Sequence, residues 1–290
     1  MKPYLLVLLA AFLWGIVGVL TTGVLQEGVA ALEIAFWRAL IAGAIFLIHG
    51  LLRREVKLEK SKDTAILVGF GFLGVTIFFS AYNMAIEQGG ISLAVVLLYT
   101  APFFVVILAR IFLKERITLR KSLAVFLVLL GVSLVAIGGT GAGIQVTSGA
   151  LFWGLVAGFG YGSYYIVGKV LLQRHTPLGI YAISFPIGAL GLLPFVQFAP
   201  KSLYAWGFIL LLAFFSTYLS NLIYMIGLKN ADASKAVLVA SLEPVIAAIL
   251  AAIFFGELFG PLGLVGAALV VLASVVGVVK VNPRFFRKTL

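Results

Sequence analysis

The sequence predicts an all-α polytopic membrane protein whose ten transmembrane helices form two five-helix inverted repeats. Three observations lead to this fold class. The chain is 63% hydrophobic and 11% charged, with a mean hydropathy of +1.19, far above a soluble globular profile. It contains ten long apolar runs. It also contains two matching segments whose neighbouring loops differ in charge.

The ten apolar runs set the number and the type of the spans. A helix needs about 20 residues to cross roughly 30 Å of hydrocarbon. Lipid leaves backbone groups unsatisfied unless the chain forms helices or a closed barrel, and runs of this length exclude the barrel. We expect spans over residues 4–22, 32–51, 65–86, 91–112, 120–138, 149–170, 178–197, 203–228, 233–255 and 261–280.

The matching segments are residues 82–117 and residues 224–259, which align without a gap. The shared residues recur 142 positions later, in the pairs Tyr82 and Tyr224, Ser92 and Ser234, Ala94 and Ala236, Val95 and Val237, Pro102 and Pro244, Ile107 and Ile249, Leu108 and Leu250, Ala109 and Ala251, Ile111 and Ile253, Phe112 and Phe254, and Glu115 and Glu257. The repeat predicts two halves, residues 1–140 and 145–290, joined by a glycine-rich linker at residues 138–143.

The loop charges predict that the two halves lie in opposite orientations. The turn after the first segment carries Lys114, Arg116, Arg120 and Lys121, whereas the equivalent turn at residues 256–263 has no Lys or Arg. Five helices per half is an odd number, so the second half must enter from the other side. Nineteen of the 21 Lys and Arg residues then fall on one side. The positive-inside rule makes this side cytoplasmic, with both termini on it. An inverted repeat is typical of a secondary transporter.

Composition and motifs argue against several other classes of protein. The net charge of +11 is concentrated in the cytoplasmic loops, which disfavours a nucleic-acid partner. The chain has no cysteine, so a disulfide framework and a thiolate metal site are excluded. No Ser-His-Asp set or metal-ligand spacing is evident, so we expect no catalytic site, metal or cofactor, and an intramembrane enzyme is disfavoured. The expected partners are a small-molecule substrate and the lipid bilayer.

Glu243 is the foremost candidate for a functional side chain. It lies about ten residues into its apolar run and therefore roughly 15 Å deep, near the bilayer centre. A carboxylate at this depth is costly unless it is protonated, paired or solvated by a cavity. One hypothesis is a site for proton coupling or for a substrate amine. The other is a protonated acid that hydrogen-bonds a neighbouring helix beside Pro244 and fixes the fold.

Pro102 and Pro244 occupy equivalent places in the two halves. A proline inside a helix removes a hydrogen bond and kinks the helix, which frees a carbonyl group. In transporters, interrupted helices in corresponding positions of the halves mark the binding site. We expect the two prolines to act as hinges for alternating access, with static curvature of the cavity wall as the alternative.

Polar and aromatic side chains at mid-depth supply further cavity candidates. Polar residues follow helical spacing over residues 76–87 and again over residues 217–224, so each set shares one helix face that avoids lipid. Deep aromatic rings stack on a substrate or hold a cation. The alternatives are interhelical hydrogen bonds and ordinary packing. The candidate substrate-cavity residues are Trp14, Ser80, Asn83, Tyr99, Tyr161, Tyr218 and Asn221.

Two smaller signals concern helix packing and a buried cation. Gly154, Gly158 and Gly162 are spaced for close contact between helices. Arg38 lies about six residues inside its apolar run, and we expect it to snorkel outward or to pair with Glu33.

A series of short motifs follows the predicted helices: Leu13-Trp14-Gly15, Phe36-Trp37-Arg38-Ala39, Leu98-Tyr99-Thr100-Ala101-Pro102, Ser241-Leu242-Glu243-Pro244 and Gly256-Glu257. Through these motifs, their order and the ten-helix count, the chain resembles the drug/metabolite transporter superfamily, in the type built from two EamA domains. The resemblance implies a basket-like bundle whose first, third, fourth, sixth, eighth and ninth helices line a central cavity. It also implies a structural role for Arg38 and export of amino acids or related metabolites.

The sequence therefore predicts a secondary active or facilitative transporter of small polar metabolites that works by alternating access, with amino-acid export favoured. The alternatives are uptake or exchange of choline, a nucleotide sugar or a sugar phosphate, and a lipid-handling or scaffold membrane protein. Proton coupling through Glu243 and facilitated exchange are equally compatible with the sequence. We expect the protein in the inner (plasma) membrane of a prokaryote, with both termini cytoplasmic.

Overall fold

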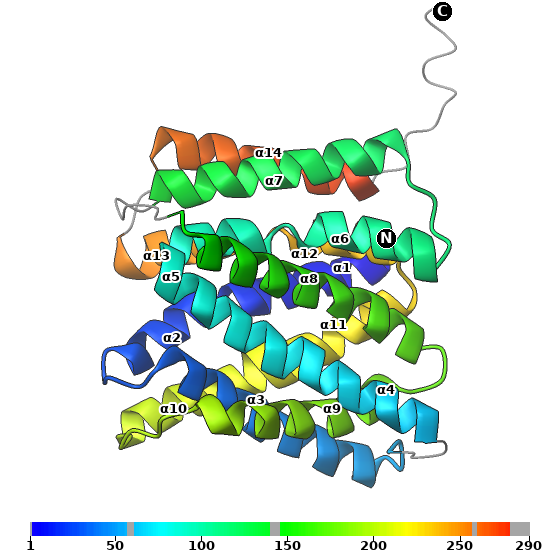
Figure 1. The fold of residues 1–290 in the computed structure, drawn as a ribbon, viewed down its shortest axis with the longest axis vertical. Coiled ribbons are helices and arrows are strands. Elements are labelled where there is room, and N and C mark those ends of the chain that lie inside the picture. The colour runs from blue at the N-terminus through cyan, green and yellow to red at the C-terminus, as the bar shows by residue number, and fades with distance from the viewer. Residues whose placement is uncertain (1, 57–60, 140–145, 257–259, 279–290) are drawn as a thin grey trace, which may run out of the picture.

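A computed structural model of the chain is all helical over the residues it describes, which are 2–56, 61–139, 146–256 and 260–278 (Figure 1). Glu257 and most of the predicted linker, residues 140–143, lie outside this part of the chain. The α-helices are α1 (Lys2–Gly15), α2 (Val17–Leu25), α3 (Ala31–Leu52), α4 (Ser61–Gly71), α5 (Phe78–Leu98), α6 (Ala101–Phe112), α7 (Leu119–Gly139), α8 (Ser148–Leu171), α9 (Pro177–Leu192), α10 (Leu203–Leu211), α11 (Ser220–Lys229), α12 (Ala233–Ala240), α13 (Glu243–Phe255) and α14 (Pro261–Val278).

The ten predicted spans correspond to these helices. By length and composition, the described residues hold nine helices able to cross a membrane and one shorter apolar helix, α6. One of the nine, Asp63–Leu98, contains parts of two predicted spans, because the chain turns within α5 at Gly90, where φ is 81° and ψ is 164°. Glycine adopts such a positive φ at little steric cost. The structure thus confirms an all-α polytopic membrane protein of about ten spans.

The helices that contain the two equivalent prolines are interrupted at the same place. α5 gives way to α6 at Tyr99 and Thr100, and α12 gives way to α13 at Ser241 and Leu242, which is 142 positions later. At both breaks one amide bonds four residues back and the next bonds three residues back, a tight 3₁₀-like turn. A proline follows each break near the start of the next helix. Because proline lacks an N–H and clashes with the carbonyl four residues before it, the helix ends before the ring.

Two π-helical segments also occupy related positions. Phe72–Ile77 joins α4 to α5, and Leu212–Leu219 joins α10 to α11. The first segment, shifted by 142 positions, falls on residues 214–219, inside the second. Such wide turns are rare and are often found at functional sites. Nothing in the hydropathy of these spans predicts them.

Helices of the two halves pack in matching pairs. α7 lies along α14 and α3 lies along α9, while α1 packs against α11 and α5 packs against α8 (Figure 1). The first two pairs join elements five spans apart in the chain. In the other two pairs, α8 lies five spans after α1, and α11 lies five spans after the first part of α5. Each of these two pairs is therefore the counterpart of the other.

The glycines of α8 allow the close contact that their spacing predicts. A Cβ atom on Gly154 would lie 2.4 Å from the side chain of Leu97, and one on Gly158 would lie 2.6 Å from the Leu97 carbonyl oxygen. A Cβ on Gly162 would lie 3.0 Å from Phe104. The structure therefore confirms these glycines as the packing surface of α8 against α5 and α6.

The contact between α7 and α14 provides a stability prediction. A Cβ on Gly266 would lie 2.5 Å from the backbone oxygen of Gly131, so neither helix could yield without a shift of its backbone. We expect Gly266→Val to lower the free energy of unfolding by about 1–3 kcal/mol, as measured by thermal unfolding in detergent. The matched control is Gly207→Val in α10, where an added Cβ meets no atom within 4 Å. Equal losses in the two variants would contradict close packing at Gly266.

Candidate substrate cavity

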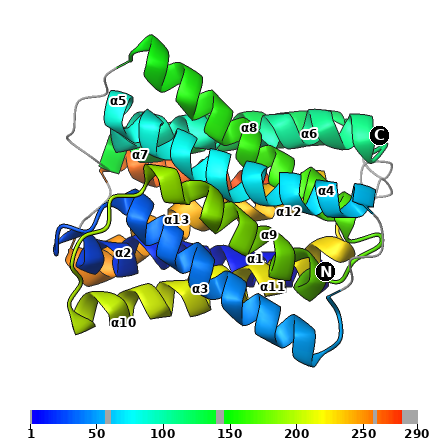
Figure 2. The ribbon, with the colours of Figure 1, turned by 60° about the horizontal axis from the view of Figure 1, so that its bottom comes forward.

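A cavity of about 620 Å³ lies at the centre of the bundle, between the two halves. Its wall includes residues of α1, α2, α3, α5, α8, α9 and α13 and of both π-helical segments. The lining extends from Glu243, at the start of α13, to Phe255, at the end of the same helix, and includes Thr22 of α2 and Ile91 of α5. The labelled α2 and α13 lie toward the end of the bundle away from the N-terminus (Figure 2). We call that end of the bundle the open end, because two of the lining residues, Ile91 and Phe255, are exposed there, at 63% and 45%.

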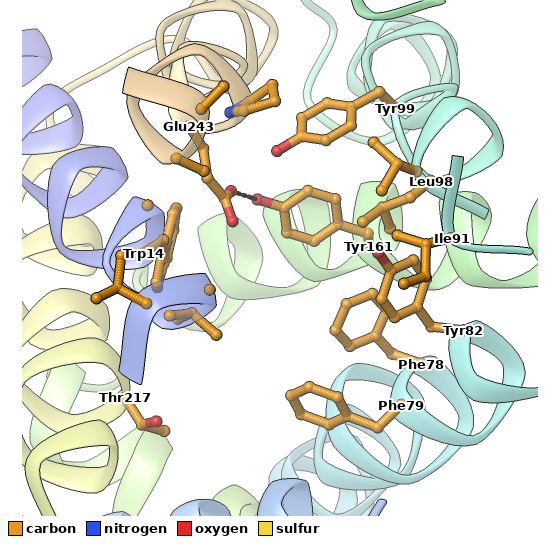
Figure 3. A pocket seen from close by; sticks show the side chains of 18 of the residues that line it. Trp14, Phe78, Phe79, Tyr82, Ile91, Leu98, Tyr99, Tyr161, Thr217 and Glu243 are labelled. Carbon is orange, nitrogen blue, oxygen red and sulfur yellow. Dashed lines mark hydrogen bonds between the residues drawn. The ribbon is translucent and has the colours of Figure 1, made fainter. Parts of the chain in front are cut away.

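The break between α12 and α13 places Glu243 at the cavity wall. Glu243 is the first residue of α13, and its carboxylate accepts a hydrogen bond of 3.3 Å from the Tyr161 hydroxyl (Figure 3). The Tyr165 hydroxyl donates in turn to the Tyr161 oxygen at 3.2 Å. The N-terminus of a helix carries partial positive charge, which favours a carboxylate at this position. The equivalent residue of the first half is Ala101, so the acid belongs to one half only.

Arg38 also lines the cavity, contrary to the expectation that it snorkels outward or pairs with Glu33. Its Nε donates to Thr217 Oγ1 at 2.9 Å, and its Nη2 donates to the Ser216 carbonyl oxygen at 3.3 Å. Its guanidinium carbon lies 5.7 Å from the ring centre of Phe79. Glu33 instead forms an ion pair with Lys201, which lies 168 positions further along the chain. The π-helical segment explains the site of Arg38, because Thr217 and Ser216 both belong to it.

Aromatic side chains line one side of the cavity. Figure 3 shows Tyr99, Tyr161, Tyr82, Phe78 and Phe79 along one side of the cavity, facing Glu243, Trp14 and Thr217. The rings hold one another in place: Phe78 stacks on Tyr161 with centres 5.6 Å apart. Aromatic faces carry negative potential and attract cations, and they also pack well against apolar groups.

Asn221 is held at the cavity wall by a buried network. Its amide nitrogen donates to the Thr217 carbonyl oxygen at 2.6 Å, and its oxygen accepts from the Tyr164 hydroxyl at 2.5 Å. Tyr164 in turn hydrogen-bonds Tyr181 of α9. Polar groups buried this deeply need such partners. The network fixes the helices that carry Thr217 and therefore also fixes Arg38.

The structure brings together six of the residues that the sequence singles out. Trp14, Tyr99, Tyr161, Asn221, Glu243 and Pro244 line the cavity. The other four lie outside its lining for reasons visible in their contacts. The Asn83 amide donates to the Phe79 carbonyl one turn back, the Tyr218 hydroxyl bonds His49 Nδ1 at 2.7 Å, and the Ser80 hydroxyl is buried. Pro102 is buried at the start of α6.

The end of the bundle that carries the N-terminus is closed by hydrogen bonds between the halves; we call it the closed end. Glu115 caps α12, because its carboxylate accepts from the amides of Ala233 at 2.7 Å and Ser234 at 3.4 Å. It also bonds the Ser234 hydroxyl and pairs with Lys121 at 3.0 Å. These bonds satisfy backbone N–H groups that a helix start otherwise leaves without a partner. The first half is thus attached to the second at this end.

Lys169 adds hydrogen bonds within the second half at the closed end. Its ammonium group, on the last turn of α8, donates to the carbonyl oxygens of Leu228 and Ala231 at 2.7 Å each and of Lys229 at 2.9 Å. A cation here complements the partial negative charge at the end of α11. Lys169 therefore ties α8 to the turn between α11 and α12.

Among the described residues, no group of three His, Cys, Asp or Glu side chains is placed to hold a metal ion.

A polytopic helical bundle around a central cavity, closed at one end and accessible at the other, has the architecture of a membrane transporter. Comparison with known families agrees. The sequence profile of the EamA-like transporter family matches residues 1–137 and 148–279, nearly the whole chain in two parts. The chain belongs to the EamA-like transporter family, within the drug/metabolite transporter superfamily.

Relatives that match most of the chain are also named as transporters. The chain is 27% identical over 267 residues to an uncharacterised inner membrane transporter, YicL, of Salmonella typhimurium, covering 89% of each chain. It is 29% identical over 241 residues to a protein of Streptantibioticus cattleyicolor named as a probable terminal-alkyne amino-acid exporter, covering 79% of this chain and 76% of that one. A crystal structure with 17% sequence identity matches it with a TM-score of 0.80 over 96% of each chain, which shows the shared fold.

Proposed function

We propose that this transporter exports amino acids or related small polar metabolites through the central cavity by alternating access. The observation that carries the proposal is the cavity itself, which has an acid, a base and an aromatic wall at the interface of the two halves. The proposal treats residues 1–140 and 145–290 as inverted repeats that rock about this site. The matching helix breaks and the paired packing of the two halves support that view.

The distribution of charge gives the proposed orientation. Positively charged side chains of the described part of the chain lie at the closed end, among them Arg53, Arg116, Arg174 and Lys229. Lys201, in contrast, lies in a loop at the open end. Under the positive-inside rule, the closed end faces the cytoplasm together with the N-terminus. The structure is then the outward-facing state of an inner-membrane protein. Both termini are cytoplasmic in this proposal, as the charge pattern of the sequence predicts.

The two prolines supply the proposed hinges. Pro102 and Pro244 follow the breaks at which α5 meets α6 and α12 meets α13. The residues at a break make fewer helical hydrogen bonds, so a change of φ and ψ there costs less than inside a regular helix. Rotation about both breaks would close the open end around Glu243 and release the closed end. In this proposal, transport requires no hinge other than these two helix breaks.

The cavity chemistry ranks the candidate substrates. A phosphate group carries nearly two negative charges, and Arg38 is the cation among the described residues that line the cavity. Sugar phosphates and nucleotide sugars therefore fit less well than amino acids, while choline would use Glu243 and the aromatic wall alone. The name of the Streptantibioticus relative also favours amino-acid export.

A second pocket favours lipid handling as the other candidate function. It has a volume of about 500 Å³, is lined mainly by apolar residues of α1, α2, α10 and α13, and shares Val19, Thr22 and Phe255 with the central cavity. A lipid chain could reach the cavity by this route. A polar substrate would not need it.

A binding screen followed by exchange tests the proposed function. Purified protein would be heated with single amino acids, choline, sugar phosphates, nucleotide sugars and short-chain phospholipids. A ligand at a hundredfold excess over its Kd stabilises the folded state by about 2.7 kcal/mol. We expect an amino acid to raise the melting temperature most and to drive counterflow of its own labelled form in proteoliposomes. Stabilisation by the phospholipids alone would contradict amino-acid export and would favour lipid handling.

A further inference from the structure

We infer that the cavity recognises a zwitterion, with the substrate ammonium group at Glu243, its carboxylate at Arg38 and its apolar side chain against the aromatic wall. This inference rests on the proposed transport function and names the chemistry of its substrate. It assigns Arg38 to carboxylate binding, a role that neither its helix position nor its motif predicts. The carbons between the two charged groups of the ligand would then lie near Tyr161.

The carboxylate of Glu243 has the capacity to bind an ammonium group. A carboxylate offers about four lone-pair positions. The Tyr161 hydroxyl donates to it. Tyr99, which lies at the break between α5 and α6, also interacts with it. The remaining positions face the cavity, and an ammonium group brings three donors to them. The surrounding rings of Trp14 and Tyr99 add cation–π attraction for the same group.

The guanidinium of Arg38 has unused donors for a carboxylate. Arginine has five N–H donors, and the described structure gives partners to two of them, through Thr217 and the Ser216 carbonyl. These bonds fix the plane of the group from the side of the π-helical segment. Phe79 covers one face of it. Arg38 lines the cavity, and a carboxylate bound there to the remaining donors would favour two parallel hydrogen bonds.

The two charged groups act on one ligand because they share one cavity. No salt bridge joins Arg38 to Glu243 among the described residues, and both side chains line the same cavity. A ligand with both charges satisfies both groups at once. An amine without a carboxylate leaves the Arg38 donors without an anion, and an acid without an amine leaves Glu243 without a cation. Sites of this type discriminate strongly against a ligand that lacks one polar group.

The wall between the charges indicates the side chain of the ligand. Phe78, Phe79 and Tyr82 form a continuous aromatic surface on the side that faces Glu243 (Figure 3). Apolar and aromatic groups bury well against such a surface. A cavity of about 620 Å³ leaves room for a large side chain after both charged groups are bound. A large apolar or aromatic amino acid therefore fits better than glycine or alanine.

A ligand series crossed with point variants tests this assignment. The first series is L-phenylalanine, 2-phenylethylamine and 3-phenylpropanoate, and the second is L-leucine, isoamylamine and 4-methylpentanoate. Binding of each would be measured to the wild type, Arg38→Gln and Glu243→Gln. The control, Arg53→Gln, removes an exposed charge from the end of α3, the helix that also carries Arg38. We expect one zwitterion to bind about tenfold to a hundredfold more tightly than either of its analogues.

The decisive comparison is between ligands in a single variant. Arg38→Gln should weaken binding of the zwitterion by about tenfold to a hundredfold, yet leave binding of the amine unchanged. Glu243→Gln should weaken the zwitterion and the amine but not the acid. A merely structural Arg38 would weaken all three ligands alike, and that result would overturn the inference. If Arg38→Gln does not fold, Arg38→Lys serves instead, since it keeps the charge but loses the fork and should weaken the zwitterion selectively.

Failure of the inference can be told apart from failure of the proposed function. If neither zwitterion binds and counterflow is obtained with choline or a sugar phosphate, the zwitterion assignment is wrong and small-molecule transport stands. If no soluble metabolite binds or exchanges, both are wrong. If a zwitterion binds, equal binding of its amine analogue would also overturn the role of Arg38.

Discussion

Glu243→Gln is expected to reduce substrate counterflow by about a hundredfold while the protein keeps its helical fold. The glutamine side chain has nearly the same size and still accepts a hydrogen bond from Tyr161, so the packing of α13 should persist. It has no negative charge with which to bind an ammonium group. The measurement is the rate of counterflow in proteoliposomes at a substrate concentration below KM.

The same variant separates the hypotheses for this acid. A substrate-amine site predicts loss of binding and of counterflow together. A coupling site predicts that counterflow persists, because exchange needs no net proton movement, while accumulation driven by a proton gradient is lost. A protonated structural acid predicts little change in either, because a neutral amide can replace a neutral acid. The control is Glu27→Gln, which removes an exposed acid at the end of α2, and it should transport normally.

Glu115→Gln should have the second large effect, by loosening the closed end of the bundle. Glu115 accepts bonds from two amides and a hydroxyl of α12 and pairs with Lys121, and both side chains are nearly buried, at 13% and 9% exposed. Loss of the charge leaves Lys121 without its anion. We expect the closed end to be destabilised relative to the opened state by about 2–4 kcal/mol. The population that is open at this end should therefore rise.

Thiol labelling measures this shift directly, because the natural chain contains no cysteine. Ser241→Cys is a nearly isosteric reporter that is 1% exposed and lies between Glu243 and the closed end. Its labelling by a maleimide added from the cytoplasmic face should become at least about tenfold faster when Glu115→Gln is added. The control is Arg174→Gln, which breaks the ion pair of an arginine that is 70% exposed at the same end and should change little. Equal rates in all three proteins would show that Glu115 does not hold the closed end.

The fold was accessible from the sequence because membrane proteins follow strong local rules. Span length and the effect of a proline depend on neighbours in sequence, and the internal repeat is visible when two segments of the chain are compared. The helices and the breaks before Pro102 and Pro244 appear where these rules place them. The depth of Glu243 follows from the same rules. The turn at Gly90, inside what hydropathy alone reads as one long segment, also lies between two predicted spans.

The candidate site was less accessible, because it depends on contacts between distant segments. Arg38 bonds Thr217 across 179 positions of sequence, and Thr217 belongs to a π-helical segment that hydropathy does not predict. Helical spacing placed Ser80 and Asn83 on one polar face, but the wide turn at Phe72–Ile77 changes the rotation of the helix that follows. A signal was present for Arg38: an arginine deep in an apolar run seldom faces lipid.

The measurement that tests alternating access most directly is two-sided labelling of one cavity residue. Ala248→Cys places a thiol on the part of α13 that lines the cavity. A membrane-impermeant maleimide would be applied to proteoliposomes of known orientation, from one face at a time, with and without a substrate identified by the binding screen. Alternating access predicts labelling from the outer face without substrate and faster labelling from the cytoplasmic face when substrate is present outside. Labelling from one face under every condition would contradict it.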